Sequence, residues 1–261
     1  MKSILKGLII GIIFIAIGAG ILITTLAVNG WSIKVKYTME TFVAENDNDY
    51  IDIDIGASIL KTEFYDGEKI EISYPDSNRF KTVITEKDGK LTYKNNVKWY
   101  AHFYNFTKVP ETVIKLPKDK VFDLEVDLGA GTVNIASGVY GNLKIDVSAG
   151  KLDGNAITCS SLNCDVSAGT VNLTDVTCSS LNCDVSAGKM EITSLSCPDI
   201  KADVSAGKLS LGIVGVKSEY TIKASVSAGS CNVSNQTGTT DKKLYVDCSA
   251  GSITVKFTLD G

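Results

Sequence analysis

The sequence is poor in the side chains that catalysis and zinc binding usually require. It contains one histidine, His102, with no carboxylate or cysteine near it in the sequence. Its seven cysteines include no Cys-x-x-Cys pair. A catalytic histidine normally works with a neighbouring acid or nucleophile, and zinc sites normally use closely spaced ligands. We therefore expect no catalytic residue, no cofactor and no zinc site, and we interpret the chain as a protein that is not an enzyme.

An excess of basic residues is also missing. The chain has 26 lysines and arginines against 30 aspartates and glutamates, and its formal net charge is −4. Proteins that bind nucleic acid present a positive surface to the phosphates. The charge balance therefore excludes nucleic acid as an expected partner.

Charge is absent altogether from one long segment near the beginning. No charged residue occurs between Lys6 and Lys34, and residues 7–28 are mostly apolar. As a helix, these 22 residues would span about 33 Å, enough to cross a bilayer. We expect residues 1–30 to be a cytoplasmic start and a single transmembrane anchor, with the C-terminal domain extracytoplasmic by the positive-inside rule. A cleaved signal peptide is the alternative, but its apolar region would be shorter.

One short phrase recurs along the rest of the chain. It reads Asp-Val-Ser-Ala-Gly or a close variant, and its first five copies are spaced 19 residues apart. The copies begin at Asp127, Asp146, Asp165, Asp184, Asp203, Ser225 and Asp247. A constant period near 20 residues is typical of a solenoid, in which each repeat packs against its neighbours.

Apolar and polar residues alternate on both sides of the phrase. Leu162, Cys164 and Val166 show the apolar positions of one copy, and a further apolar pair, such as Ile157 and Cys159, occurs in the 19-residue units. Alternation with a period of two indicates strands that bury one face. Three short strands and three corners in each unit predict an all-β fold, a parallel three-sided β-solenoid. We expect right-handed, β-helix-like winding because parallel crossovers are right-handed.

The repeat also predicts how the chain is divided. Residues 121–261 are expected to form about seven coils of 19 to 22 residues, and the phrase glycine is expected to have positive φ at the corner. Residues 31–120 are expected to hold a first coil, beginning near residue 50, and an antiparallel or aromatic cap or insertion. Asp88-Gly89 is typical of a hairpin turn. A cap is needed because an open terminal coil exposes strand edges and core.

The densest aromatic cluster lies inside this expected cap. Its members include Trp99, Tyr100, Phe103 and Tyr104. Aromatic side chains can stack on a ligand or contact a membrane, and they can also plug the end of a hydrophobic core. The cluster is therefore a candidate for ligand contact, with the core plug as the alternative.

The repeated aspartates form a second candidate. Because their neighbours face inward, Asp127, Asp146, Asp165, Asp184 and Asp203 should form an outward row. Such a row could bind cations as a calcium stripe, since carboxylates and serine hydroxyls are oxygen ligands. Alternatively, each carboxylate accepts hydrogen bonds from the backbone of its own Ser-Ala-Gly corner. Ser225 favours the second interpretation, because it keeps an acceptor oxygen without the charge.

The cysteines occupy positions of the repeat that other coils fill with Ile, Val, Leu or Ala. We interpret them as small buried apolar residues. Cys159, Cys178 and Cys197 share one position, and a disulfide between stacked members is geometrically conceivable.

The repeated phrase, followed in several copies by Lys-Leu or Lys-Met, resembles the bacterial putative-adhesin, or toast-rack, family of membrane-anchored envelope proteins. The resemblance runs from Asp127 to Val255 and implies an extracytoplasmic all-β repeat domain without catalytic residues. It favours a non-enzymatic, adhesin-like surface interaction or an envelope-sensing module, with the membrane and an envelope polymer or surface protein as partners. Two alternatives are a carbohydrate-active β-helix enzyme and a signalling partner of another membrane protein.

Overall fold

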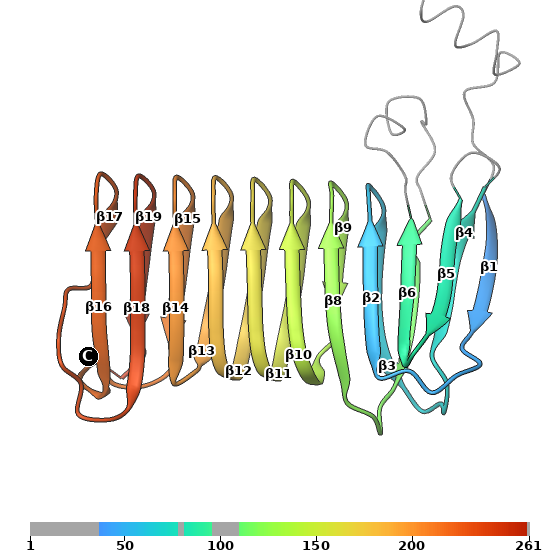
Figure 1. Cartoon of the computed structure of the whole chain (residues 1–261), viewed down its shortest axis with the longest axis horizontal. Coiled ribbons are helices and arrows are strands. Elements are labelled where there is room, and N and C mark those ends of the chain that lie inside the picture. Colours follow the sequence, from blue (N-terminus) through green and yellow to red (C-terminus); the bar gives the residue numbers. More distant parts are fainter. Residues whose placement is uncertain (1–36, 78–80, 96–109, 260–261) are drawn as a thin grey trace, which may run out of the picture. The chain divides into compact units, whose positions relative to one another are not determined.

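The computed structural model describes residues 37–77, 81–95 and 110–259, which form an all-β arrangement (Figure 1). The strands are β1 (Thr38–Val43), β2 (Tyr50–Ile55), β3 (Ile59–Tyr65), β4 (Glu71–Asp76), β5 (Thr82–Lys87), β6 (Lys90–Asn95), β7 (Thr112–Pro117), β8 (Phe122–Leu128), β9 (Thr132–Ile135), β10 (Gly138–Val147), β11 (Lys151–Val166), β12 (Thr170–Val185), β13 (Lys189–Ser196), β14 (Asp199–Val204), β15 (Lys208–Ile213), β16 (Tyr220–Val226), β17 (Ser230–Cys231), β18 (Lys242–Cys248) and β19 (Ser252–Phe257). One 3-10 turn, η1 (Lys217–Glu219), precedes β16. The expected anchor, residues 1–30, lies outside these ranges, and within them no helix is long and apolar enough to span a bilayer.

The strands that carry the phrase form one parallel ladder together with β6. Its spatial order is β6, β2, β8, β10, β11, β12, β14, β18, β16. Equivalent residues of successive copies lie opposite one another, as Asp146 does to Asp165 and Asp165 to Asp184. The ladder therefore follows the 19-residue period of the sequence, and the prediction that a coil begins near residue 50 is confirmed by the pairing of β2 with β8.

The strands that follow each corner form a second parallel ladder. It runs in the matching order β7, β3, β9, β11, β12, β13, β15, β19, β17. In the middle coils, a short third ladder pairs Ile157 with Val176 and Val176 with Leu195. Stacked parallel coils of this kind are the arrangement of a β-solenoid. Its right-handed winding stays a prediction.

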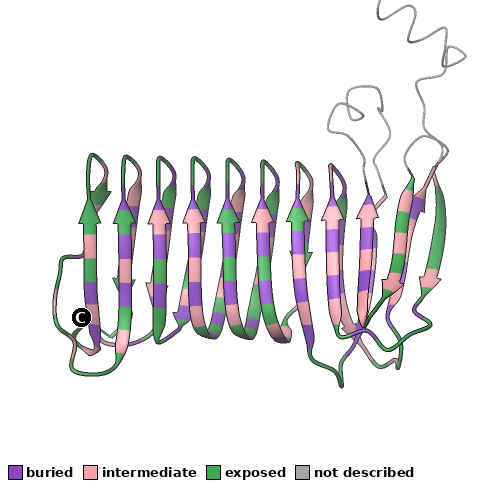
Figure 2. Cartoon of the chain, viewed as in Figure 1, coloured by how far each residue is buried: buried purple, intermediate pink, exposed green. Residues whose placement is uncertain are grey.

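The core is built from the inward residues that the alternation predicted. Leu162, Cys164 and Val166 on one strand are each 2 % exposed or less, and the same positions are buried in the neighbouring coils. Figure 2 shows this alternation as bands of buried and exposed residues along the strands. Each coil therefore completes the apolar core of the next.

The corner glycines are required for a different reason from the one predicted. Among the described glycines, only Gly89 and Gly215 have positive φ. At Gly188, a Cβ would lie 2.5 Å from the carbonyl oxygen of Gly169 in the neighbouring coil. The corners need glycine because two backbones approach closely there, so the expectation of positive φ was wrong.

The coils are not stacked in the order of the sequence at the end formed by β16. The coil of β18 and β19 lies between the coil of β14 and β15 and the coil of β16 and β17. Figure 1 shows β18 between β14 and β16. The outermost coil of this end therefore comes earlier in the chain than the coil beneath it.

The opposite end has the same exchange and, in addition, an antiparallel cover. The coil of β2 and β3 lies between that of β6 and β7 and that of β8 and β9. Strand β5 pairs antiparallel with β6, β4 pairs antiparallel with β7, and β1 pairs antiparallel with β4. The predicted hairpin turn at Asp88-Gly89 joins β5 to β6, and both of its residues have positive φ.

Candidate functional site

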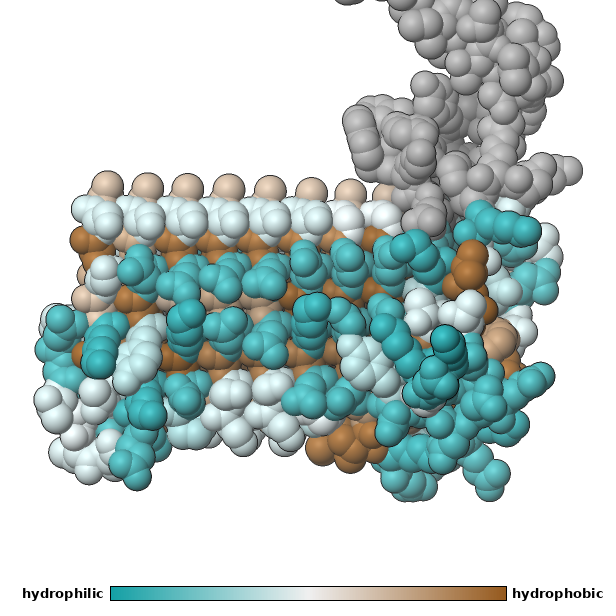
Figure 3. Space-filling model, viewed as in Figure 1, coloured by the Kyte–Doolittle hydropathy of each residue, from teal (hydrophilic) through white to brown (hydrophobic). Residues whose placement is uncertain are grey.

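The outer face of the first ladder carries the predicted row of aspartates. Each member is exposed or partly exposed, so the prediction that the row faces outward is confirmed. Followed by the register from β2 to β16, the row consists of Asp54, Asp127, Asp146, Asp165, Asp184, Asp203, Asp247 and Ser225. Figure 3 shows residues of like hydropathy running in rows along the coils.

The N–H groups of the serine and alanine positions of each corner donate to the neighbouring coil and not to the aspartates. The N–H groups of Ser167 and Ala168 donate to the carbonyl oxygens of Val147 (2.9 Å) and Ser148 (2.7 Å). The same pattern repeats at the other corners. None of the hydrogen bonds found among the described residues joins a row carboxylate to a corner N–H group. The predicted capping role of the aspartates was therefore wrong.

The middle of the row accumulates negative charge. Burial raises the pKa of Asp165, and the neighbouring carboxylates of Asp184 and Asp146 raise it further. Burial also raises the pKa of Asp127. Toward the end, Lys201 pairs with Asp203 at 3.3 Å. Among the described residues, no group of three or more histidine, cysteine or acidic side chains is arranged to hold a metal ion.

A second outward row, which we call the mixed row, runs two residues before the aspartates. In the order of the coils it consists of Asp52, Glu125, Lys144, Asn163, Asn182, Lys201, Tyr245 and Lys223. Glu125 accepts hydrogen bonds from the Tyr50 hydroxyl (2.5 Å) and the Lys144 ammonium group (2.6 Å). These bonds lower the pKa of Glu125, while the carboxylate and burial raise the pKa of Tyr50 to about 12.

The mixed row ends in a groove of about 750 Å³ over β14, β18 and β16. Tyr245 lies between Lys201 and Lys223 in the register, and the Lys223 ammonium group is 5.0 Å from the centre of its ring. Asp203 and Asp247 line the same groove, so two cationic and two anionic side chains meet there. Tyr245 is the one aromatic residue in the mixed row, and its half-buried ring interrupts an otherwise polar face.

Residues 235–237 form one wall of the groove. Gln236 makes an antiparallel bridge with Ile222 of β16, with N–H to oxygen distances of 2.9 and 3.0 Å. The Asn235 side chain accepts a hydrogen bond from the N–H group of Ala224 at 2.6 Å. The wall is therefore fixed to the outermost strand by backbone and side-chain bonds.

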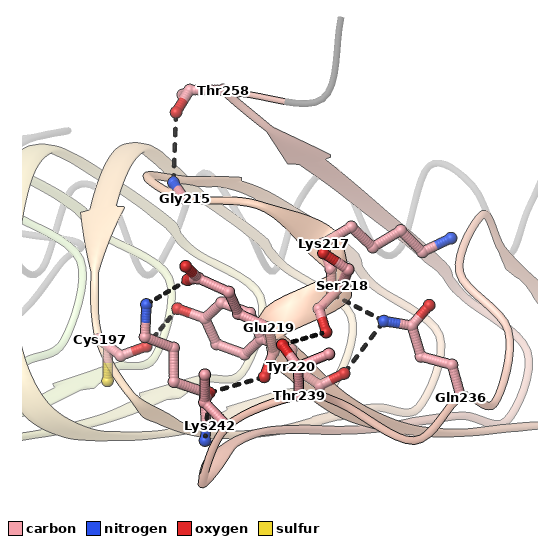
Figure 4. A network of polar contacts seen from close by, with 11 residues as sticks. Cys197, Gly215, Lys217, Ser218, Glu219, Tyr220, Gln236, Thr239, Lys242 and Thr258 are labelled. Carbon is pink, nitrogen blue, oxygen red and sulfur yellow. Dashed lines mark hydrogen bonds and ion pairs between the residues drawn. The ribbon is translucent and has the colours of Figure 1, made fainter.

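A polar network includes Gln236 of this wall (Figure 4). The Gln236 amide donates to the carbonyl oxygens of Lys217 (2.6 Å) and Tyr220 (3.0 Å), and Lys242 pairs with Glu219 at 2.5 Å. The Tyr220 hydroxyl donates to the carbonyl oxygen of Cys197 at 2.8 Å, and burial raises the pKa of Tyr220 to about 12. The network anchors the irregular segments 214–219 and 232–241 to the regular coils.

Sequence reasoning missed this groove. The phrase was visible, but nothing in the widened spacing after Asp203 indicated that β18 lies between β14 and β16. Only that order places Tyr245 between two lysines. The predicted ligand-contact residues Trp99, Tyr100, Phe103 and Tyr104, like His102, lie outside the described residues.

No curated protein matches the chain. Among solved structures, a putative adhesin from Bacteroides fragilis is 15% identical, with 84% of this chain and 97% of that chain covered and a TM-score of 0.47. A putative cell adhesion protein from Clostridium sporogenes is 16% identical, with coverage of 85% and 100% and a TM-score of 0.35. A putative lipid binding protein from Parabacteroides distasonis is 17% identical, with coverage of 84% and 96% and a TM-score of 0.45.

The family comparison covers most of the chain. The Toastrack DUF4097 family model matches residues 48–260, which include all of the stacked coils described above. The parallel ladders, their Ser-Ala-Gly corners and this match lead to one assignment: the chain belongs to the Toastrack DUF4097 family.

Proposed function

We propose that this protein is a membrane-anchored, extracytoplasmic, non-enzymatic binding module that holds a glycan of the cell envelope in the groove at Tyr245. The observation that carries the proposal is the placement of this half-buried aromatic ring between Lys201 and Lys223 in a walled groove. Adhesion and envelope sensing both use such a contact, because each begins with recognition of a surface polymer.

The chemistry of the groove suits a sugar. A pyranose ring has an apolar face of C–H groups and a rim of hydroxyls, so it packs on an aromatic ring while its hydroxyls bond to polar side chains. Around Tyr245, the lysines donate hydrogen bonds, Asp247 accepts them, and Asn235 can do both.

The charge of the groove favours a polymer without a large net charge. Lys201 already pairs with Asp203 at 3.3 Å, and Asp247 lies in the same groove. A polyanion would meet these carboxylates as well as the lysines. A neutral glycan would bond to both kinds of charged side chain without repulsion.

The test is sedimentation of the full-length chain, in detergent, with insoluble cell-wall glycan. We expect Tyr245→Ala to weaken binding about tenfold or more, a loss of about 1.4 kcal/mol. Asn163→Ala is the matched control, because Asn163 belongs to the same row but lies away from the groove. Equal effects of the two substitutions, or no sedimentation of the unaltered chain, would exclude the groove as a glycan site.

The anchor is tested separately. We expect the full-length chain to stay with membranes after an alkaline carbonate wash, because residues 7–28 are apolar and uncharged. A chain that lacks residues 1–30 is expected in the soluble fraction. Release of the full-length chain by the wash would contradict a transmembrane anchor.

A further inference from the structure

Three cysteines form a column along one side of the stacked coils. Cys159 lies opposite Cys178, and Cys197 follows Ser196, which lies opposite Thr177. The three side chains are 5%, 5% and 3% exposed, respectively. Ser160 and Ser179, which follow two of them directly, are exposed. The three cysteines are therefore buried, although the residue that follows Cys159 and the residue that follows Cys178 are exposed.

The middle thiol of the column contacts the thiol on each side of it. Cys178 hydrogen-bonds to both Cys159 and Cys197, and this contact is the largest influence on the pKa of each thiol. It lowers the pKa of the two outer thiols and raises the pKa of Cys178. An outer cysteine is therefore the one that loses its proton first.

The ladder spacing sets which pairs can be joined. Neighbouring parallel strands lie about 4.8 Å apart, within the Cα separation of about 4.4 to 6.8 Å that disulfides accept. Cys159 and Cys197 are two coils apart, at about 9.6 Å, which is beyond that range. Cys178 is thus the shared partner in either possible bond.

A second pair in the same coils provides an internal comparison. Cys164 also lies opposite Cys183, but these residues are only 1% and 0% exposed. Burial raises the pKa of both thiols, and no thiol–thiol hydrogen bond contributes to either shift. This pair has the register of the column, but no hydrogen bond between its two thiols affects their pKa values.

We propose that Cys159, Cys178 and Cys197 form a thiol–disulfide exchange site, in which Cys178 forms a disulfide with either outer cysteine and leaves the other as a free thiol. The oxidant is a low-molecular-weight disulfide, RSSR. An outer cysteine, after losing its proton, attacks one sulfur of RSSR, forms a mixed disulfide and releases RS⁻. Cys178 then loses its proton and attacks the outer cysteine's sulfur, which releases the second RS⁻.

The exchange balances without any other reactant. Two cysteine thiols are oxidised to one disulfide, RSSR is reduced to two thiols, and the two protons lost by the cysteines end on the two RS⁻ groups. The third cysteine can later attack Cys178, which moves the disulfide along the column without a net change in oxidation state.

The experiment uses the reduced full-length chain and oxidised glutathione as the probe. After incubation, the protein is denatured in acid, its free thiols are labelled with N-ethylmaleimide, and its mass is measured. We expect five labels on the seven cysteines. Proteolytic mapping should find Cys164, Cys183, Cys231 and Cys248 fully labelled and the fifth label divided between Cys159 and Cys197.

Variants test the central role of Cys178. Cys178→Ala should form no disulfide within the chain, so any thiol that it loses should carry added glutathione on an outer cysteine, whereas Cys159→Ala and Cys197→Ala should each still lose two thiols without added glutathione. Cys178→Val is a second variant that fills the position with an apolar side chain, and circular dichroism verifies that each variant is folded. Loss of two thiols without added glutathione from a folded Cys178 variant, or seven labels on the treated unaltered chain, would overturn the proposal.

Discussion

The two ends of the stack differ in how they finish the same core. In the outermost coil of the end formed by β6 and β7, Leu91, Tyr93 and Ile114 are fully buried. In the outermost coil of the other end, Val226 is 44% exposed, although the equivalent Val166 in the middle is 1% exposed. A residue of the repeat is therefore buried or exposed according to what stacks beyond it, and not according to its own identity.

The cover explains the difference. Strands β5 and β4 pair antiparallel with β6 and β7, so they occupy the edges that a further coil would have occupied. At the other end, residues 235 and 236 bond to Ala224 and Ile222 of β16 and leave its last two residues exposed. One end is closed by a change of strand direction, and the other is closed only in part.

The largest expected effect comes from placing a charge at the same position in the middle and at the open end. Val166→Asp should destabilise the protein by about 3–5 kcal/mol, because the carboxylate would be buried without a partner. Val226→Asp should have an effect below about 1 kcal/mol, because water reaches that side chain. Urea denaturation of both variants measures the difference. Similar values would contradict the assigned burial of the ladder.

A smaller loss of stability is expected when a corner glycine is replaced by alanine. Gly188→Ala places a methyl group 2.5 Å from the Gly169 oxygen and should cost about 1–3 kcal/mol. Gly229→Ala meets the Gly251 oxygen at the same 2.5 Å, but its coil is outermost and can move away. We expect its cost to be at most half as large. Thermal unfolding provides the measurement, and a greater cost at Gly229 would show that the open end is held rigidly.

The closed end is tested through the hydroxyl of Tyr93. It lies 2.9 Å from the hydroxyl of Thr112, which is fully buried, so Tyr93→Phe should cost about 1–2 kcal/mol. Tyr245→Phe is the control, because the ring stays and the side chain is only partly buried. Urea denaturation compares the two. An equal, small change in both would mean that the cover does not depend on this buried contact.

The smallest effect concerns pH and the middle of the Asp row. In the folded chain, the pKa of Asp165 is raised above the ordinary value of 3.8. At pH values between the ordinary and the raised pKa, the folded chain therefore binds more protons than the unfolded chain. This group therefore destabilises the fold at neutral pH, and the penalty is relieved as pH falls through the raised pKa. Asp165→Asn should be slightly more stable than the unaltered chain at neutral pH, with a gap that narrows on acidification. A gap that widens on acidification would reverse the assigned sign.

Much of the fold follows from counting residues. Because the period is 19, Asp146, Asp165 and Asp184 had to lie opposite one another once the strands were parallel, and alternation fixed which neighbours face inward. The hairpin at Asp88-Gly89 followed from the turn preference of that pair. These features depend only on residues close in sequence or separated by one period.

The order of the coils and the chemistry of the corners could not be read in this way. The phrases at Ser225 and Asp247 follow equal, wider steps, so their spacing does not reveal which coil stacks on β14. The exchanged order of the last two coils depends on the paths of residues 214–219 and 232–241. Gly188 is required by a neighbour 19 residues away, which no local turn rule reveals. The groove depends on the order of the coils and on the chemistry of the corners, so the sequence did not predict it.

The exchanged coils also set an order of events during synthesis. A ribosome makes β16 before β18, yet β16 can take its place only with β18 already beneath it. Growth of the stack from one end, coil after coil as the chain emerges, therefore stops after the coil of β14 and β15. The segment around β16 must wait until β18 and β19 have been made, and its coil is then the last to join this end of the stack.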